Sequence, residues 1–231
     1  MVELRHSEEA DLSEIARCHM RAFPDALASC QGVGFVSKML QWYLVSERGI
    51  LLQLTASGRI VGYCGGIKIY EPGLPGAFTS ISQYAFWAFV KSTLRKPWLV
   101  VHRENLKRHR MVIRNIMIRL KLRKPTTKVS KSEIQKFKTS WGLVVIGVDP
   151  ASQKKGFGSK LLAEFERLAK EDGVECIRLS VKQTNKQAIA SYRRNGWRES
   201  ECNGDSIQMI KNVNLPNHNS DETFNDIFVK Q

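Results

Sequence analysis

The stretch Val148-Asp149-Pro150-Ala151-Ser152-Gln153-Lys154-Lys155-Gly156-Phe157-Gly158-Ser159 decides the fold of this chain. It follows the apolar run Gly142 to Val148, which has the length of a strand and the composition of one buried on both faces. It leads into a helical pattern from Ser159 to Lys170, so a loop with two glycines opens directly into a helix. Successive backbone N–H groups at a helix N-terminus, where aligned peptide dipoles add positive charge, are suited to hold phosphate. Gly156 and Gly158 allow close backbone approach, and Lys154 and Lys155 add cationic reach.

The spacing of this loop excludes two common nucleotide-binding motifs. The sequence GFGSKLL lacks the third glycine of a dinucleotide fingerprint, and no G-K-[ST] follows at P-loop spacing. Taken alone, the loop is also compatible with an ordinary strand-to-helix turn, so its neighbours along the chain have to decide.

Strand and helix patterns alternate along the rest of the chain. Before the loop we expect a strand at Val2 to Arg5, helices over Leu12 to Phe23 and Phe35 to Val45, and a hairpin of Ile50 to Leu54 with Ile60 to Tyr70. After the loop we expect a strand at Cys176 to Val181, a helix at Lys186 to Arg194 and a strand at Ser206 to Lys211. Gly173 and Gly196 follow the two later helices as stop signals. The pattern indicates an α/β protein.

Two linked motifs resemble a known family. The order strand, V-x-P, Q-x-x-G-x-G at Gln153, Gly156 and Gly158, then helix, resembles the acetyl-CoA pyrophosphate loop of the Gcn5-related N-acetyltransferase (GNAT) superfamily. The segment from Asn185 to Trp197 resembles that family's N-x-x-A-x-x-x-Y-x-x-x-G-[FW] signature at matching spacing. The resemblance covers about residues 1–70 and 141–211.

The resemblance implies the architecture. It predicts a GNAT acetyltransferase domain over residues 1–211, of the acyl-CoA N-acyltransferase type, with a mixed central sheet flanked by helices. Residues 71–140 fall outside the family pattern and are predicted to be a basic, aromatic-rich helical insertion between the third and fourth strands. Residues 212–231 form a polar C-terminal tail.

The resemblance also implies a site for acetyl-CoA as cosubstrate, with no metal. The fourth strand of the family splays from the fifth, so the backbone of Ile146 and Val148 would hold pantetheine and the acetyl carbonyl. Asn185 would lie near the pantetheine or pyrophosphate arm, unless it only caps its helix. Tyr192 would lie beside the thioester sulfur as general acid, unless it is a packed aromatic. The N–H groups that would take the pyrophosphate are those of Gln153, Lys154, Lys155, Gly156, Phe157, Gly158 and Ser159.

The implied reaction is acetyl transfer to a primary amine by direct attack in a ternary complex, since no cysteine is placed by motif as a nucleophile. The identity of the general base stays open. Glu71 and Asp25 are more simply interpreted as carboxylates in loops, and His19 as a partly buried histidine. Our preferred acceptor is an amino sugar of cell-surface polysaccharide assembly. The alternatives are a protein or peptide amine, or a non-catalytic CoA-binding module tethered to membrane or polyanion by the insertion.

The charge is concentrated in the insertion. The chain has 36 basic and 22 acidic residues, and Lys91 to Lys138 alone carries 16 basic residues against Glu104 and Glu133, which is the whole excess of +14. Arg110 to Lys124 has an amphipathic helical pattern. In one interpretation this helix packs on the core or on a partner subunit, and the chain could then form an oligomer. In the other, residues 84–124 lie on an anionic membrane surface. Nucleic acid is less favoured because large aliphatic residues interrupt the cations.

Cysteines and termini indicate the compartment. The five cysteines are odd in number and include no CxxC pair, as expected of thiols in a reducing compartment. Residues 1–11 lack a secretory signal, and the uncharged stretch Pro72 to Val90 contains two prolines, so a membrane span is not expected. The prediction is cytoplasmic, with peripheral association at the inner face of the membrane if the insertion binds lipid.

Overall fold

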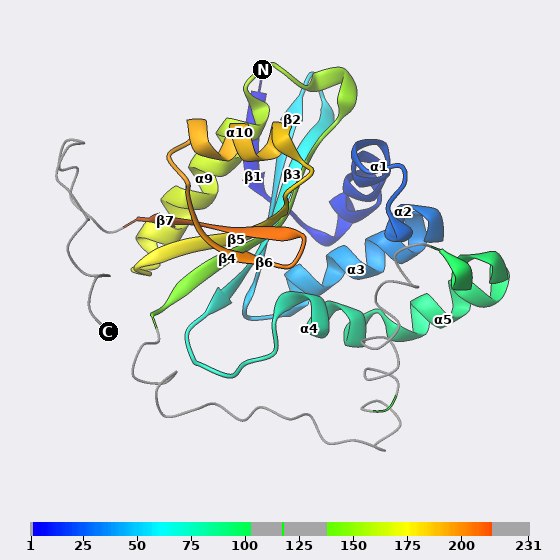
Figure 1. The fold of residues 1–231 in the computed structure, drawn as a ribbon. Helices are drawn as coiled ribbons and strands as arrows, with labels where there is room; N and C mark the ends of the chain where they lie inside the picture. Colours follow the sequence, from blue (N-terminus) through cyan, green and yellow to red (C-terminus); the bar gives the residue numbers. More distant parts are fainter. Residues whose placement is uncertain (1, 103–116, 118–137, 214–231) are drawn as a thin grey trace, which may run out of the picture.

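The computed structural model describes residues 2–102, 117 and 138–213. Its centre is a seven-stranded sheet in the order β1-β2-β3-β4-β5-β7-β6 (Figure 1). The strands are β1 (Val2–His6), β2 (Gly49–Ala56), β3 (Arg59–Ile69), β4 (Ser140–Val148), β5 (Cys176–Lys182), β6 (Arg198–Asn203) and β7 (Ser206–Asn212). The helices are α1 (Leu12–Ala22), α2 (Leu27–Gln31), α3 (Val33–Val45), α4 (Ala77–Tyr84), α5 (Phe86–Arg95), α9 (Phe157–Glu171) and α10 (Lys186–Arg194), with short 3-10 turns η1 (Glu9–Asp11), η2 (Pro97–Val101) and η3 (Pro150–Ser152).

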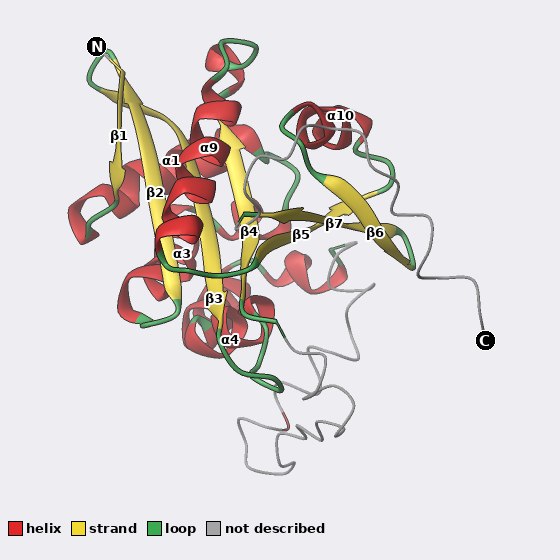
Figure 2. Cartoon of the chain, turned by 90° about the vertical axis from the view of Figure 1, so that its left-hand side faces the viewer, coloured by secondary structure: helices red, strands yellow, loops and turns green. Residues whose placement is uncertain are grey.

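The sheet is mixed, as predicted. Strands β1 to β4 pair antiparallel in chain order, β4 pairs parallel with β5, and β5, β7 and β6 are again antiparallel. The parallel pair needs a crossover, which α9 supplies. Figure 2 shows the strands β5, β7 and β6 turned away from the direction of β1 to β4. The sheet therefore changes direction at the β4–β5 junction.

Helices cover both faces of the sheet, and each face has its own core. On one face α9 and α10 pack over the sheet, where Leu161, Phe165 and Ile189 are buried. On the other face α1 and α3 pack over β2 and β3, where Ile15 and Leu40 are fully buried. The apolar residues at helical spacing in α1 and α9 produce these faces, because one stripe of each helix turns inward.

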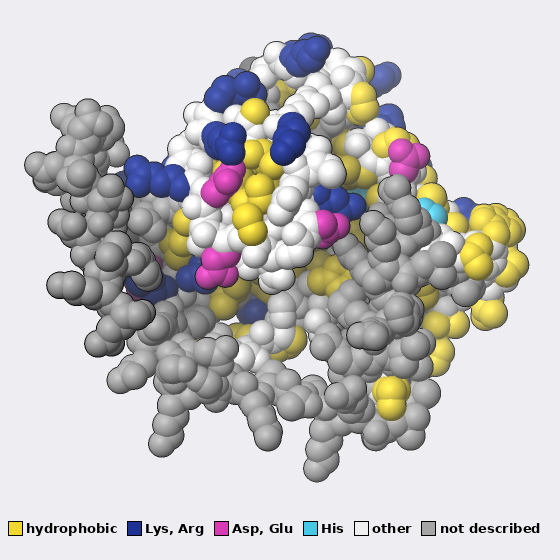
Figure 3. All heavy atoms as spheres, viewed as in Figure 1, with side chains coloured by type: hydrophobic (Ala, Val, Ile, Leu, Met, Phe, Trp, Pro, Cys, Tyr) yellow, Lys and Arg dark blue, Asp and Glu magenta, His cyan; other side chains and the backbone are white. Residues whose placement is uncertain are grey.

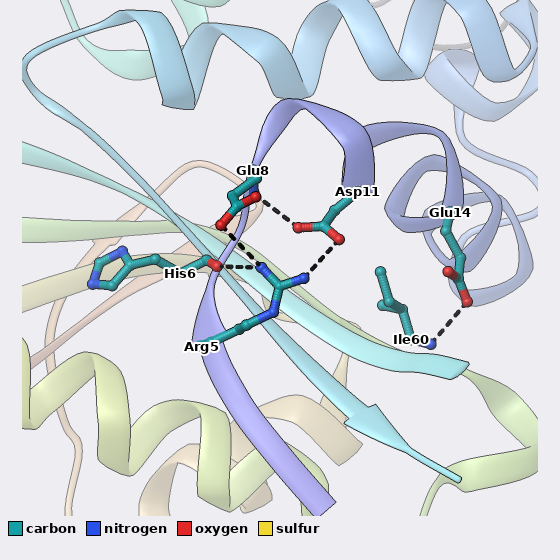
Figure 4. A network of polar contacts seen from close by, with 6 residues as sticks. All are labelled: Arg5, His6, Glu8, Asp11, Glu14 and Ile60. Carbon is teal, nitrogen blue, oxygen red and sulfur yellow. Dashed lines mark hydrogen bonds and ion pairs between the residues drawn. The ribbon is translucent and has the colours of Figure 1, made fainter. Parts of the chain in front are cut away.

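Polar contacts fix the turn from β1 into α1 (Figure 4). Arg5 Nη2 donates to Asp11 Oδ1 at 2.8 Å, and the Glu8 N–H donates to Asp11 Oδ2 at 2.8 Å. One turn later, Glu14 Oε1 accepts the N–H of Ile60 at 2.9 Å. These contacts join the start of α1 to β1 and to the β2–β3 hairpin, so α1 has a defined position on its face of the sheet.

Most predicted elements are confirmed, and the exceptions have physical reasons. The helix Lys186–Arg194 has the predicted bounds, and Gly173 and Gly196 adopt positive φ after α9 and α10. The prediction that Gly142 to Val148 is buried on both faces is wrong from Val144 on: Val144 is 40% exposed, and Val145, Ile146 and Val148 are only partly buried. Strand β6 was not predicted, because all six of its residues are exposed and no apolar alternation marks it. The short helix α2 was also not predicted.

The segment between the third and fourth strands begins after Ile69 and ends before Ser140. Its described part contains α4, α5 and η2. The predicted helix from Arg110 to Lys124 lies outside the described residues apart from Met117. In the described part of the chain, no helix has the length and apolar character needed to cross a membrane.

Candidate active site

Strands β4 and β5 separate after four paired residues. The parallel ladder runs from Ser140 opposite Cys176 to Leu143 opposite Leu179 and stops there, although β4 continues to Val148 and β5 to Lys182. The backbone of β4 beyond Leu143 therefore has no ladder partner on its β5 side. This is the splay that the resemblance implied between the fourth and fifth strands.

A β-bulge marks the point where the strands part. On the other side of β4, Leu143 pairs with Gly66 and Val145 pairs with Gly65, so Val144 is an extra residue without a partner on β3. A bulge bends its strand and increases the local twist, and it is common next to active sites. The bulge explains both the exposure of Val144 and the departure of β4 from β5.

Ile146 and Val148 lie on the separated part of β4. They pair with Cys64 and Gly62 of β3, and their side chains pack against the core on the α9 and α10 face. Their position agrees with the predicted pantetheine-binding backbone, because both residues follow the end of the β5 ladder.

Asp149 holds the start of the glycine-containing loop. Its N–H donates to the carbonyl of Val61 at 2.8 Å, and its Oδ1 accepts the N–H of Ala151 at 3.0 Å. Its Oδ2 accepts from Arg21 Nε on α1 at 2.5 Å. Partial burial would raise the pKa of Asp149, but the hydrogen bonds from Arg21 and Ala151 outweigh it and hold this pKa below its ordinary value. The carboxylate is therefore charged and fixed at neutral pH.

The loop then turns into α9 through two left-handed residues, Lys154 with φ of 62° and Gly156 with φ of 77°. Gly156 is the N-cap of α9, and a glycine there avoids the strain that a side chain would meet at positive φ. The N–H groups of the first turn, from Phe157 on, have no acceptor within the helix. These N–H groups could bind an anion, and the pyrophosphate role of the loop stays a prediction.

The side chains around the loop differ in their exposure. Gln153, Lys154, Lys155 and Ser159 are exposed, whereas Phe157 is buried in the core, so it offers the site only its backbone. Gln153 Nε2 donates to the carbonyl of Val148 at 3.2 Å, which folds the loop back on β4. A side chain at Gly158 would approach only Val148, at 4.0 Å, so the backbone there is accessible.

Tyr192 lies on α10 with its hydroxyl unoccupied. Its ring is partly buried against the same core as Ile146 and Val148, and it contacts Trp197 at 5.9 Å between ring centroids. Burial raises the pKa of Tyr192 to about 12, with a further contribution from the Cys64 thiol on β3. No described residue forms a hydrogen bond with the Tyr192 hydroxyl. The group is thus a protonated phenol without an internal partner.

Asn185 is the N-cap of α10. Its Oδ1 accepts the N–H of Ala188 at 3.1 Å, so its side-chain oxygen is used as a helix cap. The amide nitrogen has no such contact among the described residues, and a role toward a cofactor stays a prediction.

Of the three candidate bases, Glu71 lies at the end of β3 that is far from the separated strands. It follows β3, whose end at Ile69 pairs with Ser140, whereas the strands part toward Val148. Ser140 and Val148 are eight residues apart, about 25 Å along a strand. Asp25 is exposed in the turn after α1.

His19 is buried beneath β4. Its Nδ1 lies 2.5 Å from the hydroxyl of Tyr63, and its Nε2 has no partner. The Tyr63 and Phe23 rings pack under Gly147, where a Cβ would meet them at 2.8 and 3.0 Å. Burial lowers the pKa of His19 to about 4, so its imidazole is neutral at pH 7.

A thiol lies opposite the separated part of β4 and is protonated. Cys64 lies opposite Ile146, but burial raises the pKa of its thiol far above the ordinary value, and it therefore stays protonated. Among residues 2–102 and 138–213, no three His, Cys, Asp or Glu side chains gather closely enough to hold a metal ion.

The proteins to which this chain is similar include acetyltransferases. Residues 126–197 match the family model described as the acetyltransferase (GNAT) family. The PaiA N-acetyltransferase of Thermoplasma acidophilum, solved with coenzyme A, is 12% identical with a TM-score of 0.53, over 92% of this chain and 99% of that one. The ribosomal-protein-S18-alanine N-acetyltransferase of Escherichia coli is 18% identical with a TM-score of 0.51, over 95% and 98%.

A third solved structure, YncA of Salmonella typhimurium with its cofactor acetyl-CoA, is 13% identical with a TM-score of 0.53, over 94% of this chain and 96% of that one. At these identities the similarity shows a shared fold. No curated protein matches the chain in sequence.

The parted sheet and the glycine loop at the start of α9 belong to a fold that this chain shares with solved acetyltransferases. Residues 126–197 are similar to the GNAT acetyltransferase family, and the similarity of fold to the PaiA enzyme extends over 92% of the chain.

Proposed function

We propose that this enzyme transfers acetyl from acetyl-CoA to a primary amine by direct attack in a ternary complex. The observation that supports this most is the end of the β4–β5 ladder at Leu143 and Leu179, immediately before the loop that opens α9. An extended pantetheine arm can bond to the free strand backbone there, with the pyrophosphate at the start of the helix.

The proposed chemistry uses Tyr192 as the acid. The nitrogen lone pair of the amine attacks the thioester carbonyl carbon, the C–S bond breaks, and the sulfur takes a proton from the phenol. The proton that the new amide nitrogen loses returns to the phenolate and restores the phenol. A pKa of about 12 means that the phenol carries its proton at neutral pH. The proton lost by the incoming ammonium passes to solvent water, because His19 is buried and Asp25 lies in an exposed turn.

For the cofactor we propose the residues that sequence indicated. The backbone of Ile146 and Val148 would hold the pantetheine arm, the N–H groups from Gln153 to Ser159 would bind the pyrophosphate, and Lys154 and Lys155 would add charge. The exposure of both lysines and the accessible backbone at Gly158 support this. Asn185 would contribute its amide nitrogen.

For the acceptor we propose an amino sugar of cell-surface polysaccharide assembly. The strongly cationic segment between β3 and β4 supports an acceptor that carries negative charge, such as a nucleotide- or lipid-linked sugar. A protein amine is the alternative, as in the Escherichia coli neighbour named for a ribosomal protein alanine.

We propose a cytoplasmic location, because the cysteines in the described residues are free thiols. Peripheral contact with an anionic membrane is proposed for residues 84–124. The exposure of Trp87 and Trp98 in the described part of this segment supports it.

The test is release of CoA from acetyl-CoA with a panel of amines, followed by mass spectrometry of the products. The panel should contain nucleotide-linked amino sugars, free amino sugars and peptides with free N-termini or lysines. Acetylated amine and free CoA in equal amounts are expected for one class. Acetyl-CoA binding without turnover of any amine would instead indicate a non-catalytic CoA-binding module.

A further inference from the structure

A second cationic site lies away from the β4–β5 junction, between the start of α3 and one face of α5. A cavity of about 460 Å³ opens there. Its walls come from the end of α2, the first turn of α3 and the residues of α5 at i, i+3, i+4 and i+7 from Ala88. None of these elements contributes to the glycine loop, so the cavity is separate from the proposed cofactor site.

Four basic side chains line this cavity: Lys38, Lys91, Arg95 and Lys96. No acidic side chain is among the described residues that line it. Lys38 Nζ donates to Gln41 Oε1 at 2.8 Å, and Lys96 Nζ donates to the Cys30 carbonyl at 2.8 Å, both neutral acceptors. Lys91 and Arg95 form no ion pair with any residue that the structure describes. The four charges therefore repel one another without a described counter-ion.

The first turn of α3 adds partial positive charge to the same space. The helix has thirteen residues, its N-cap is Gly32, and no side chain caps it. The N–H groups of Phe35 and Val36 donate to the Gly32 carbonyl at 3.1 Å, which leaves those of Val33 and Gly34 without an acceptor among the described residues. A Cβ on Gly32 would lie 3.9 Å from Lys96 Nζ, and one on Gly34 would meet nothing within 4 Å. The N-terminal end of α3 is consequently close to the Lys96 ammonium group and accessible to a ligand.

A buried amide whose oxygen has no partner among the described residues also lines the cavity. Gln31 is only 5% exposed, its Nε2 donates to Thr93 Oγ1 at 3.2 Å, and its Oε1 forms no hydrogen bond. A buried polar atom without a partner is unfavourable by roughly 1–3 kcal/mol. If the amide turns over, Oε1 accepts the Thr93 hydroxyl and the NH₂ group can donate to an anion. A ligand in the cavity would satisfy the group that the protein leaves unpaired.

We infer that this cavity binds a phosphate monoester. A dianion matches four cations and a helix N-terminus, and the volume leaves room for the alcohol part of an ester as well as for the phosphate. The site does not depend on the proposed acetyl transfer, because it uses other residues. The same phosphate chemistry has two sources, a small soluble ester and the headgroup of a lipid such as phosphatidic acid.

The outer face of α5 bears on the choice between these sources. Trp87 and Leu94 on α5 are 65% and 77% exposed, and Trp98 in η2 is 64% exposed. Figure 3 shows hydrophobic side chains gathered at the right-hand edge of the molecule, over this segment. A lipid headgroup in the cavity would bring these side chains to the membrane interface, whereas a soluble ester would not use them.

The experiment compares two probes and matched variants. Binding of glycerol 3-phosphate is measured by calorimetry, and co-sedimentation is measured with vesicles of phosphatidylcholine alone or mixed equally with phosphatidic acid. Lys91→Gln/Arg95→Gln removes two cations of the cavity, and Lys170→Gln/Arg178→Gln removes two exposed cations from α9 and β5. Gln31→Glu places a negative charge at the buried amide. Acetyl-CoA affinity and circular dichroism show that each variant is folded.

The inference predicts that the Lys91/Arg95 variant weakens binding of one probe by at least about tenfold, as does Gln31→Glu, while the control pair changes it less than about twofold. Binding of glycerol 3-phosphate identifies a soluble ester. Binding only to phosphatidic acid vesicles, reduced further by Trp87→Ala/Leu94→Ala, identifies a lipid headgroup. The inference is overturned if neither probe binds, or if the control pair weakens binding as much as the cavity pair. Because acetyl-CoA affinity is measured separately, failure here leaves the proposed reaction intact.

Discussion

Arg21 on α1 and Asp149 at the end of β4 form an ion pair, with 2.5 Å between Arg21 Nε and Asp149 Oδ2. Asp149 also caps the η3 turn through Ala151, so one carboxylate joins α1 to the first turn of the cofactor loop. The two helices that lie on opposite faces of the sheet, α1 and α9, are connected through this contact and the loop that follows it.

A double-mutant cycle of Arg21→Gln and Asp149→Asn tests this connection. Since Arg21 is about half exposed, we expect a coupling free energy of only about 0.2–1 kcal/mol in urea unfolding. Asp149→Ala should lower the free energy of unfolding by about 1 kcal/mol more than Asp149→Asn, because the hydrogen bond from Ala151 is lost as well. We also expect acetyl-CoA to bind a few-fold more weakly to both Asp149 variants. Strictly additive single mutants would show that the pair does not link α1 to the loop.

Tyr192→Phe should lower kcat by about a hundredfold and leave acetyl-CoA affinity unchanged. Stability should change little, because the hydroxyl has no described hydrogen bond to lose. With a pKa of about 12, the phenol stays protonated up to about pH 10, so the ratio of wild-type to variant kcat should be constant from about pH 6 to that value.

The matched control for this variant is Tyr70→Phe, which removes a hydroxyl that donates to Asp172. It should reduce stability by about 1 kcal/mol without lowering kcat. Equal kcat in wild type and Tyr192→Phe would exclude the phenol as the acid.

Gly156→Ala tests the left-handed turn of the cofactor loop. A side chain at this φ of 77° meets no atom within 4 Å, so its effect is backbone strain of about 1 kcal/mol. Gly173→Ala, at φ of 73° after α9 and with equally open surroundings, should lose the same stability. Isothermal titration should show weaker acetyl-CoA binding, by about threefold or more, for Gly156→Ala alone. Equal affinity in both variants would mean that the shape of the loop is not used to bind the cofactor.

His19 should make stability depend on pH. The folded protein protonates this ring only near pH 4, while the unfolded chain does so near 6.5. Between these values the unfolded state binds more protons, so the free energy of unfolding falls as the pH is lowered from about 6.5 to about 4. Compared with His19→Gln, wild type should lose up to about 3 kcal/mol across this window. Parallel pH profiles of the two proteins in chemical denaturation would contradict a buried neutral His19.

The elements with regular apolar spacing could be predicted from sequence, and so could the loop, because its glycines and the strand before it have local causes. The bulge at Val144 could not be predicted, since it depends on the pairing of β3 with β4 rather than on the valine itself. Strand β6 could not be predicted either. It pairs only with β7 in the described sheet and all its residues are exposed, so its sequence shows no apolar alternation.

The site followed the same division. The motifs single out Gln153, Gly156 and Tyr192, whose roles stay predictions. The distance of Glu71 from the separated strands depends on the register of β3 with β4, which no local pattern indicates. The Gln31 amide and the cations around it gave no sequence signal. They meet only when α2, α3 and α5 pack together.

Strand β6 is an edge strand of the sheet, and this position affects how the protein behaves at high concentration. Its outer edge offers unpaired backbone groups to a strand of another molecule, which is how many sheets begin to aggregate. Arg198, Glu199 and Glu201 lie along this strand, and all are exposed. A second copy aligned against the edge would have to remove these charges from water. The charged edge therefore protects the fold against growth into fibres at high concentration.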